Sequence, residues 1–133
     1  MREILFRGKR VDNGEWVEGY YSPVNIPITG NMGHFINVGG YRAVEIDPET
    51  VSQFTGLCDK NGVKIFEGDI IEYTDGCNDW LGAVKYASDD AQFVVRFIGG
   101  DVESFDNLYS GDCEVIGNIY DNPELLEVSK NEM

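Results

Sequence analysis

Carboxylates are the side chains through which this sequence could do chemistry, because it holds 24 aspartates and glutamates and a single histidine. Oxygen ligands bind divalent cations, so three or more converging carboxylates could form the centre of a metal-dependent hydrolase or nucleic-acid-processing enzyme. The candidates for such a cluster are Asp69, Glu72, Asp75, Asp79, Asp101, Glu103 and Asp106. No catalytic constellation accompanies them, so this enzyme is kept as an alternative and no metal ligand is assigned.

Histidine and cysteine chemistry has little support in the sequence. A nucleophilic triad would have to use His34, which lies in a glycine-rich stretch with no sign of an oxyanion hole nearby. Zinc is not expected, because Cys58, Cys77 and Cys113 are widely separated and form no Cys-x-x-Cys pair. Glycine patterns that cradle nucleotide phosphates do not occur either. We therefore assign no catalytic residue, no cofactor and no metal.

The tetrapeptide Asp59-Lys60-Asn61-Gly62 resembles the start of a calcium-binding loop. Its glycine comes at position four instead of six, and Ile70 stands where the loop needs a glutamate at position twelve. An EF-hand is therefore rejected. The same four residues form a strong turn, which predicts a hairpin between residues 53–58 and 63–66.

Short strands divided by glycine turns are the dominant local pattern, since 16 glycines interrupt every candidate helix. The turn at 12–14 predicts a hairpin of residues 4–10 and 15–21. Residues 22–40, rich in proline, glycine and asparagine, are expected to be irregular apart from a possible short strand at 34–38. The residues 47–50 suit either a helix start or a turn before a strand, and we favour the turn.

The second half of the chain predicts a small barrel. Five short apolar runs separated by turn residues are expected as strands, namely 69–73, 82–86, 92–98, 101–105 and 113–120. Asn122-Pro123-Glu124 opens a short C-terminal helix over 124–128. The fold class is thus mainly β, with a small SH3-like barrel packed with N-terminal β-hairpins. We expect one domain, 1–133, with an N-terminal β subregion at 1–64 and a barrel-like subregion at 65–133.

The formal net charge of -14 is unevenly distributed. Residues 1–64 hold seven basic and eight acidic residues, whereas residues 65–129 hold two basic and fifteen acidic residues. This acidity argues against a protein that grips nucleic acid or an anionic membrane through a basic face. It also raises an alternative function, an acidic DNA mimic that inhibits a host nucleic-acid-binding protein, which would need carboxylates in two rows on one face.

The location expected from the sequence is the cytoplasm. The charged start shows no signal peptide, and no run approaches the roughly 18 apolar residues of a membrane span. Three cysteines make an odd number, which does not suit a secreted disulfide framework.

Three stretches carry a family resemblance: residues 2–8 (REILFRG), 53–70 (QFTGLCDKNGVKIFEGDI) and 115–126 (VIGNIYDNPELL). In this order they resemble the YopX family, which phages and bacterial prophages encode, over essentially the full length. The resemblance implies a small, mostly β protein without an established activity. It defines no catalytic or ligand-binding residue, so none is transferred.

The motif residues are interpreted as structural. Asn61 and Gly62 suit a turn, Gly68 suits a bend or bulge, and Asp69 can accept hydrogen bonds from backbone amides there. Asn118 is expected to satisfy backbone groups at a bend and Pro123 to begin the helix. The function expected is therefore that of a non-enzymatic phage or prophage accessory protein that binds a phage or host protein. A homo-oligomer is plausible because small barrels with exposed edges often pair.

Overall fold

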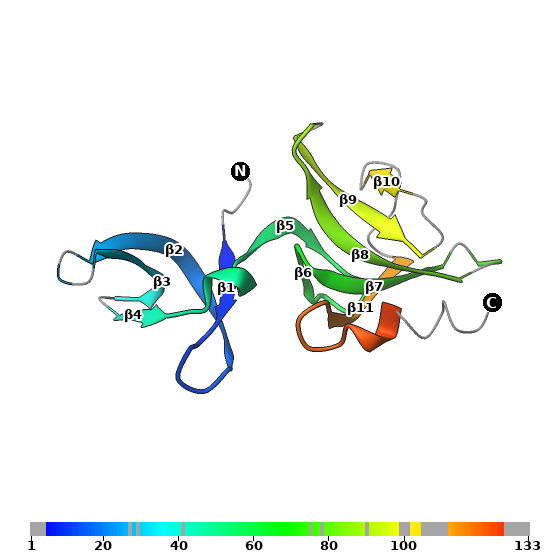
Figure 1. The fold of residues 1–133 in the computed structure, drawn as a ribbon. Coiled ribbons are helices and arrows are strands. Elements are labelled where there is room, and N and C mark those ends of the chain that lie inside the picture. Colours follow the sequence, from blue (N-terminus) through cyan, green and yellow to red (C-terminus); the bar gives the residue numbers. More distant parts are fainter. Residues whose placement is uncertain are drawn as a thin grey trace. The chain divides into compact units, whose positions relative to one another are not determined.

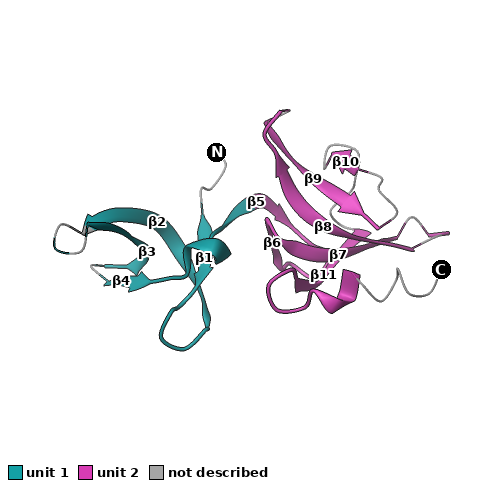
Figure 2. Cartoon of the chain, in the orientation of Figure 1, with its two compact units in different colours: residues 1–54 teal, residues 55–133 magenta. Residues whose placement is uncertain are grey.

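A computed structural model describes residues 5–26, 28, 30–40, 42–74, 76–77, 79–89, 91–98, 102–104 and 112–126. The protein is mainly β, as predicted, and its strands form two antiparallel sheets. The chain divides into two compact units, residues 1–54 and residues 55–133 (Figure 2). This division comes before the subregion boundary expected at 64/65, and residues 55–64 belong to unit 2, where the Lys60 N–H donates to the Cys113 carbonyl at 3.0 Å.

The strands of the described residues follow one another through short connections (Figure 1). They are β1 (Phe6–Lys9), β2 (Trp16–Ile26), β3 (Asn31–Gly39), β4 (Arg42–Glu45), β5 (Ser52–Cys58), β6 (Lys64–Phe66), β7 (Asp69–Thr74), β8 (Asp79–Ala87), β9 (Gln92–Phe97), β10 (Val102–Ser104) and β11 (Cys113–Asn118). The first sheet has the order β4-β3-β2-β1-β5-β6, and the second has the order β10-β9-β8-β7-β11.

The predicted hairpin at the start of unit 1 is present. β1 and β2 pair antiparallel, with Phe6 opposite Gly19 and Lys9 opposite Trp16. The turn closes through hydrogen bonds from the Arg10 N–H to the Glu15 carbonyl and from the Gly14 N–H to the Arg10 carbonyl, both 2.9 Å. The apolar residues Ile36 and Ile46 are at most 1% exposed in this unit.

The expectation of an irregular segment at 22–40 is wrong, although the possible short strand at 34–38 is present within β3. β2 continues to Ile26 and pairs with β3, so that Tyr20 lies opposite Asn37 and Ile26 opposite Asn31. Pro23 is tolerated because β1 accompanies β2 only as far as Gly19, which leaves Pro23 with a neighbouring strand on one side among the described residues. A proline in an edge segment costs no ladder hydrogen bond, and this is why composition misled the prediction.

The residues 47–50 form one turn of 3₁₀ helix, η1 (Pro48–Thr50), and lead into β5. The Asp47 carboxylate accepts a hydrogen bond from the Glu49 N–H at 3.0 Å and caps this turn. The favoured prediction of a strand after residue 50 is therefore correct. The N-cap hydrogen bond that the helix alternative required is also present, but it caps only a single helical turn.

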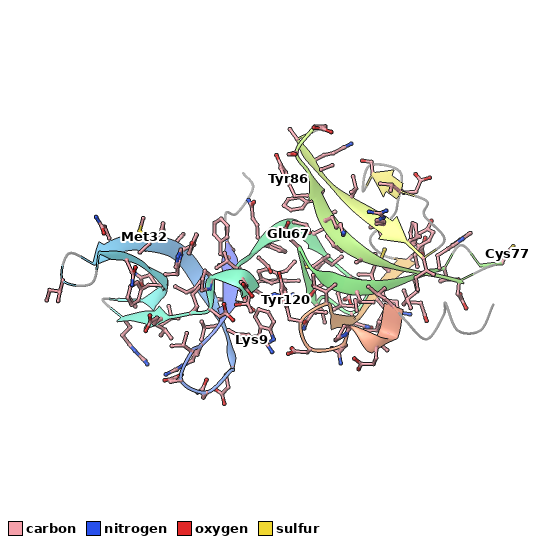
Figure 3. All side chains as sticks on the ribbon, viewed as in Figure 1. Lys9, Met32, Glu67, Cys77, Tyr86 and Tyr120 are labelled. Atoms are coloured by element: carbon pink, nitrogen blue, oxygen red, sulfur yellow. The ribbon has the colours of Figure 1, made fainter. Side chains whose placement is uncertain are left out.

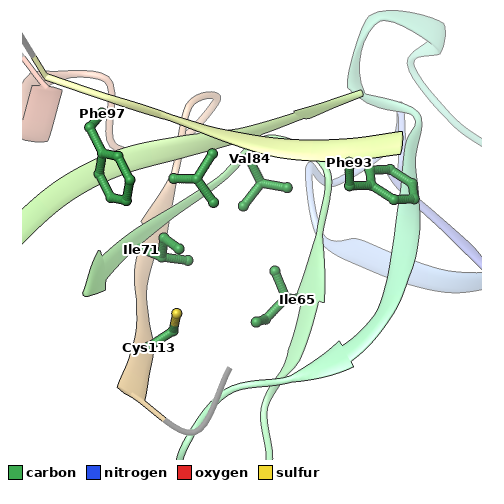
Figure 4. Packing of buried hydrophobic residues seen from close by; sticks show 7 residues of the cluster. Ile65, Ile71, Val84, Phe93, Phe97 and Cys113 are labelled. Atoms are coloured by element: carbon green, nitrogen blue, oxygen red, sulfur yellow. The ribbon is translucent and has the colours of Figure 1, made fainter. Parts of the chain in front are cut away.

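Unit 2 is built around the five-stranded sheet. Phe93, Val95 and Phe97 alternate along β9 and point to one side, as the sequence pattern predicts. They pack with Ile71, Val84 and Cys113, and with Ile65 from β6, in one buried cluster (Figure 4). The hairpin of β5 and β6 thus supplies part of this core.

The sheet of unit 2 has β10 and β11 at its two edges, so closure into an SH3-like barrel is not established by the described strands. Residues 124–126 are helical, as expected, and residues 127 and 128 of the predicted helix lie outside the described part of the chain. Within the described residues, no helix is both long enough and apolar enough to cross a membrane.

Candidate functional site

The two long motif segments meet in unit 2. The Lys60 N–H donates to the Cys113 carbonyl at 3.0 Å, and the Ile119 N–H donates to the Gly68 carbonyl at 2.8 Å. These bonds join the hairpin of β5 and β6, and the bend before β7, to the chain around β11. We use the name motif node for four residues that the two motif segments contribute to this region: Asp59, Gly68, Asp69 and Asn118.

Asp59 lies at the centre of the motif node and is only 6% exposed. Its Oδ1 accepts hydrogen bonds from the backbone N–H groups of Asn61 at 2.8 Å and Val63 at 2.9 Å. Its Oδ2 accepts from the Val115 N–H at 2.9 Å. Both carboxylate oxygens therefore face backbone donors, so the carboxylate organises the turn and holds β11 at the same time.

The charge of Asp59 is stabilised within the fold. Burial by itself would raise the pKa of this carboxyl, but the backbone N–H groups of Val115, Val63 and Asn61, together with Lys60, outweigh burial and lower the pKa below its ordinary value. An ionised carboxylate that accepts several backbone hydrogen bonds is a structural anchor. Asn61 and Gly62 complete the turn: the Gly62 N–H donates to the Asp59 carbonyl at 3.0 Å, and Gly62 has a φ of 81°.

Gly68 and Asp69 shape the bend before β7. Gly68 has a φ of 89°, a left-handed conformation that favours glycine, and a Cβ at this position would lie 3.2 Å from Cε2 of Tyr120. Its N–H donates to the Val84 carbonyl at 2.8 Å. Asp69 is 1% exposed, and its Oδ2 accepts from the Phe66 N–H at 2.8 Å. The bend is therefore closed by buried polar groups.

Asn118 organises the chain after β11, where the pairing with β7 shifts between Val115 and Gly117. Its Oδ1 accepts from the N–H groups of Tyr120 at 3.0 Å and Asp121 at 2.9 Å. The Pro123 carbonyl then accepts from the Leu126 N–H at 3.2 Å in the first turn of the helix.

Asp59 was missed as a key residue by sequence reasoning, which treated it as one member of a turn. A local signal existed, because an aspartate commonly accepts hydrogen bonds from amides two to four residues later. The bond to Val115 had no local signal, since 56 residues separate the two.

Of the carboxylates considered for a metal centre, the four that the structure describes, Asp69, Glu72, Asp79 and Glu103, are not part of a metal-binding group. Among the described residues, no group of three or more His, Cys, Asp or Glu side chains could hold a metal ion. Asp69 is bound to the Phe66 N–H, whereas Glu72 and Asp79 are exposed on β7 and β8. Glu103 lies on β10, and Asp75, Asp101 and Asp106 lie outside the described residues.

Acidic and basic side chains share one face of the five-stranded sheet. Glu72 lies directly opposite Glu114 on the paired strands β7 and β11, and Glu114 forms an ion pair with Lys60 at 3.1 Å. The register places Lys85 and Arg96 on the same face as Glu72. A DNA mimic would need two rows of carboxylates on one face, whereas this face of the described strands carries both acids and cations.

His34 lies on β3 in unit 1, and its side chain is half-buried instead of lying in an exposed turn. Its Nδ1 is 2.5 Å from the Tyr21 hydroxyl, and the two rings stack with centroids 5.9 Å apart. This contact joins side chains of the paired strands β2 and β3.

A pocket of about 490 Å³ in unit 1 lies between the β1–β2 turn and β4. Arg10, Asp12, Arg42 and Glu45 contribute its charged lining, and Val11 contributes an apolar side chain. Arg10 and Asp12 form an ion pair at 2.7 Å. The pocket thus carries balanced charges and has no histidine or cysteine in its lining.

The most distinctive surface of unit 1 is a stretch without charge. Residues 19–41 contain no Asp, Glu, Lys or Arg, although such residues make up 26% of the chain. Most of this stretch forms the outer part of β2 and β3, residues 20–26 and 31–38, which we call the uncharged ribbon. It holds exposed apolar side chains at Tyr20 (69% exposed), Val24 (47%) and Met32 (55%), the last labelled in Figure 3.

The register of the uncharged ribbon defines its two faces. Residues directly opposite each other share a face, and so do residues two apart on one strand. Because Ser22 lies opposite Phe35, Tyr20, Val24 and Phe35 share one face. Met32, opposite Asn25, lies on the other face.

Comparison with known proteins places the chain in a family. The YopX protein family matches residues 5–127, so this chain belongs to the YopX family, as the three motif segments indicated. The crystal structure of protein EF1440 from Enterococcus faecalis is similar, with a TM-score of 0.56 and 29% sequence identity over 95% of this chain and 99% of that chain. No curated protein matches the sequence.

Proposed function

We propose that this YopX protein is a non-enzymatic accessory protein of a phage or prophage that acts inside the bacterial host cell by binding another macromolecule. The observation that carries the proposal is the uncharged ribbon, which exposes Tyr20 and Val24 on one face. The centres of protein interfaces are depleted of charged residues and enriched in aromatic residues and methionine. The ribbon combines these properties in a chain whose net charge is -14.

The motif node supports a separation between residues that serve folding and residues that serve binding. Asp59 and Asp69 are buried, and they and Asn118 accept hydrogen bonds from backbone N–H groups of the same chain. A catalytic or ligand-binding carboxylate needs access to its substrate or ion, and these groups are directed into the fold. The residues that define the family motif thus serve folding, and the ribbon is the surface left for binding.

The two alternatives receive less support from the described residues. A metal-dependent hydrolase would need converging carboxylates, and Glu72 and Asp79 are exposed on separate strands. A DNA mimic would need uninterrupted rows of acids, and Lys85 and Arg96 lie on the face that carries Glu72.

We also propose that unit 2 is a partly closed SH3-like barrel. Its support is Ile65 of β6, which is buried in one cluster with Val84 and Phe93 of the sheet, so that the β5–β6 hairpin contributes to the core. Backbone contacts between β6 and an edge strand, seen as cross-strand nuclear Overhauser effects, would establish closure. Their absence would leave an open sheet with a packed hairpin.

The functional proposal is tested by affinity capture of tagged protein from the bacterial host during infection or prophage induction. We expect Tyr20→Glu to abolish recovery of the bound macromolecule, because it puts a charge on the apolar face of the ribbon. Tyr86→Glu is the matched control, since Tyr86 is exposed (46%) on β8 in unit 2. Equal recovery with both variants, or metal-dependent turnover of a substrate by the purified protein, would contradict the proposal.

A further inference from the structure

We propose that Asn61 is a site of spontaneous deamidation in this chain and that Asp59 controls how fast the reaction runs. The sequence holds two Asn-Gly dipeptides, Asn13-Gly14 and Asn61-Gly62. Asparagine is thermolabile, and a glycine after it leaves the attacking backbone nitrogen without hindrance from a side chain. The inference goes beyond the proposed function, because it concerns the hairpin of β5 and β6 and does not use the uncharged ribbon.

The reaction needs only this chain and water. The Gly62 backbone nitrogen gives up its proton and forms a bond to Cγ of Asn61, while the bond from Cγ to Nδ2 breaks and ammonia leaves. Water then opens the cyclic imide at either of its two carbonyl carbons and produces aspartate or isoaspartate. The net change replaces an amide with a carboxylate, and in isoaspartate the main chain runs through Cβ and Cγ.

The carbon that is attacked in this reaction is open to solvent. Asn61 and Gly62 are both exposed. The Asn61 backbone N–H donates to Asp59 at 2.8 Å, and no group of the described residues is hydrogen-bonded to the Asn61 side-chain amide. The Asn13 side chain differs, because its Oδ1 accepts from the Glu15 N–H at 2.9 Å. At Asn61 the control of the reaction therefore lies in the backbone.

Asp59 holds the nitrogen that must attack. The Gly62 N–H donates to the Asp59 carbonyl at 3.0 Å, and Gly62 has the left-handed φ, 81°, of a three-residue hairpin loop. The Asp59 carboxylate accepts from the N–H groups on either side, those of Asn61 and Val63. Three consecutive N–H groups thus donate to one residue, so the Gly62 nitrogen loses its proton and turns toward Cγ only when this turn opens.

The same carboxylate connects the reaction to β11. Oδ2 of Asp59 accepts from the Val115 N–H at 2.9 Å, so the carboxylate is held in place while β11 is paired with β7. In isoaspartate the additional backbone carbon displaces the N–H groups of Gly62 and Val63 from Asp59. Deamidation therefore loosens the turn irreversibly, and it places a second carboxylate two residues from Asp59.

The experiment follows both dipeptides by mass spectrometry in the purified full chain at mildly alkaline pH. Fragment spectra that distinguish aspartate from isoaspartate give the conversion rates at Asn61 and Asn13, in buffer and in urea. We expect folding to slow the reaction at Asn61 at least about tenfold, which corresponds to about 1.4 kcal/mol for opening the turn. Asp59→Asn should raise the rate at Asn61 in buffer at least about threefold and change the rate at Asn13 less than about twofold.

Asp69→Asn is the matched control. Asp69 is also a buried aspartate of unit 2, and it accepts a hydrogen bond from the Phe66 N–H at 2.8 Å. The N–H groups of the turn, however, donate to Asp59. Asp69→Asn should therefore leave the ratio of the rates at Asn61 and Asn13 unchanged. Urea unfolding of each variant measures how much stability it has lost.

An Asn61 that is not converted in urea overturns the site, and equal rates at Asn61 in buffer and in urea overturn its control by the fold. An equal rise at Asn61 in Asp59→Asn and Asp69→Asn overturns the role of Asp59, because lost stability then explains both. If Asp59→Asn does not fold, the wild type in urea below its unfolding transition decides. The rate at Asn61 should exceed the unfolded fraction multiplied by the rate of the unfolded chain, and equality would overturn opening of the turn as the controlling step.

Discussion

The Oδ2 atom of Asp59 accepts a hydrogen bond from the Val115 N–H at 2.9 Å, and 56 residues separate the two along the chain. Through this bond one buried carboxylate connects the turn after β5 to the edge strand β11. It explains why the two motif segments belong together: the first supplies the acceptor, and the second supplies the backbone donor.

Replacing Asp59 with asparagine should destabilise the protein by about 1–3 kcal/mol. The side-chain amide nitrogen of asparagine cannot accept a hydrogen bond, so at least one buried backbone N–H would face another donor. Urea unfolding at pH 7 measures the change. Asp89→Asn is the control, since Asp89 lies exposed in the β8–β9 turn, and it should change stability by less than about 0.5 kcal/mol. Equal stability of the two variants would contradict the role assigned to Asp59.

The stabilisation by Asp59 should depend on pH. Its pKa is lowered in the folded state, so its contribution is complete above the unfolded value of about 3.9 and is lost as the pH falls through the lower folded value. The free energy of unfolding of the wild type should therefore exceed that of Asp59→Asn most at pH 7, and the difference should narrow toward about pH 2–3. A constant difference over this range would show that the charge of Asp59 contributes nothing.

Gly68→Ala should cost more stability than Gly62→Ala. Both glycines have positive φ values, 89° and 81°, so each alanine carries backbone strain of roughly 1–2 kcal/mol. At Gly68 the new Cβ would also lie 3.2 Å from Cε2 of Tyr120, whereas nothing lies within 4 Å of a Cβ at Gly62. Thermal or urea unfolding of the two variants compares them, and a larger loss at Gly62 would be inconsistent with the packing of Tyr120.

The three thiols should differ in reactivity. Burial, with smaller contributions from Asp112 and Asp59, raises the pKa of Cys113 to about 11, whereas Cys58 and Cys77 are exposed. At pH 8 only about one Cys113 side chain in a thousand would be the reactive thiolate. Titration with a disulfide reagent should therefore show two fast thiols and a third that reacts on unfolding. Three equally fast thiols would contradict the burial of Cys113.

Local patterns in the sequence predicted much of the fold. The turns at 12–14 and 59–62, and the alternation of Phe93, Val95 and Phe97, depend on neighbouring residues and were predicted correctly. The middle of the ribbon, residues 22–26 and 31–33, was not, because Pro23 and Gly33 suit a loop, and only the pairing of β2 with β3 shows that they lie in strands. Turn chemistry is local, whereas the existence of an edge depends on tertiary structure.

The motif node was predictable in part. Gly68, Asp69 and Asn118 have residue types that suit bends, and they lie at bends in the structure. That Asp59 would be buried and would bind Val115 depends on how β11 pairs with β7, and no local pattern carries this information. The uncharged stretch was visible in the sequence, but its exposure required the register of β2 and β3.

Amide hydrogen exchange at Val115 measures whether Asp59 joins the two motif segments and so holds the fold together. In the wild type at pH 7 the Val115 N–H should be strongly protected, because it donates to the buried Oδ2 of Asp59. In Asp59→Asn the protection of this amide should fall by about tenfold or more relative to that of Val95 in the core strand β9. An unprotected Val115 amide in the wild type, or identical protection in both proteins, would show that Asp59 does not hold β11 in place.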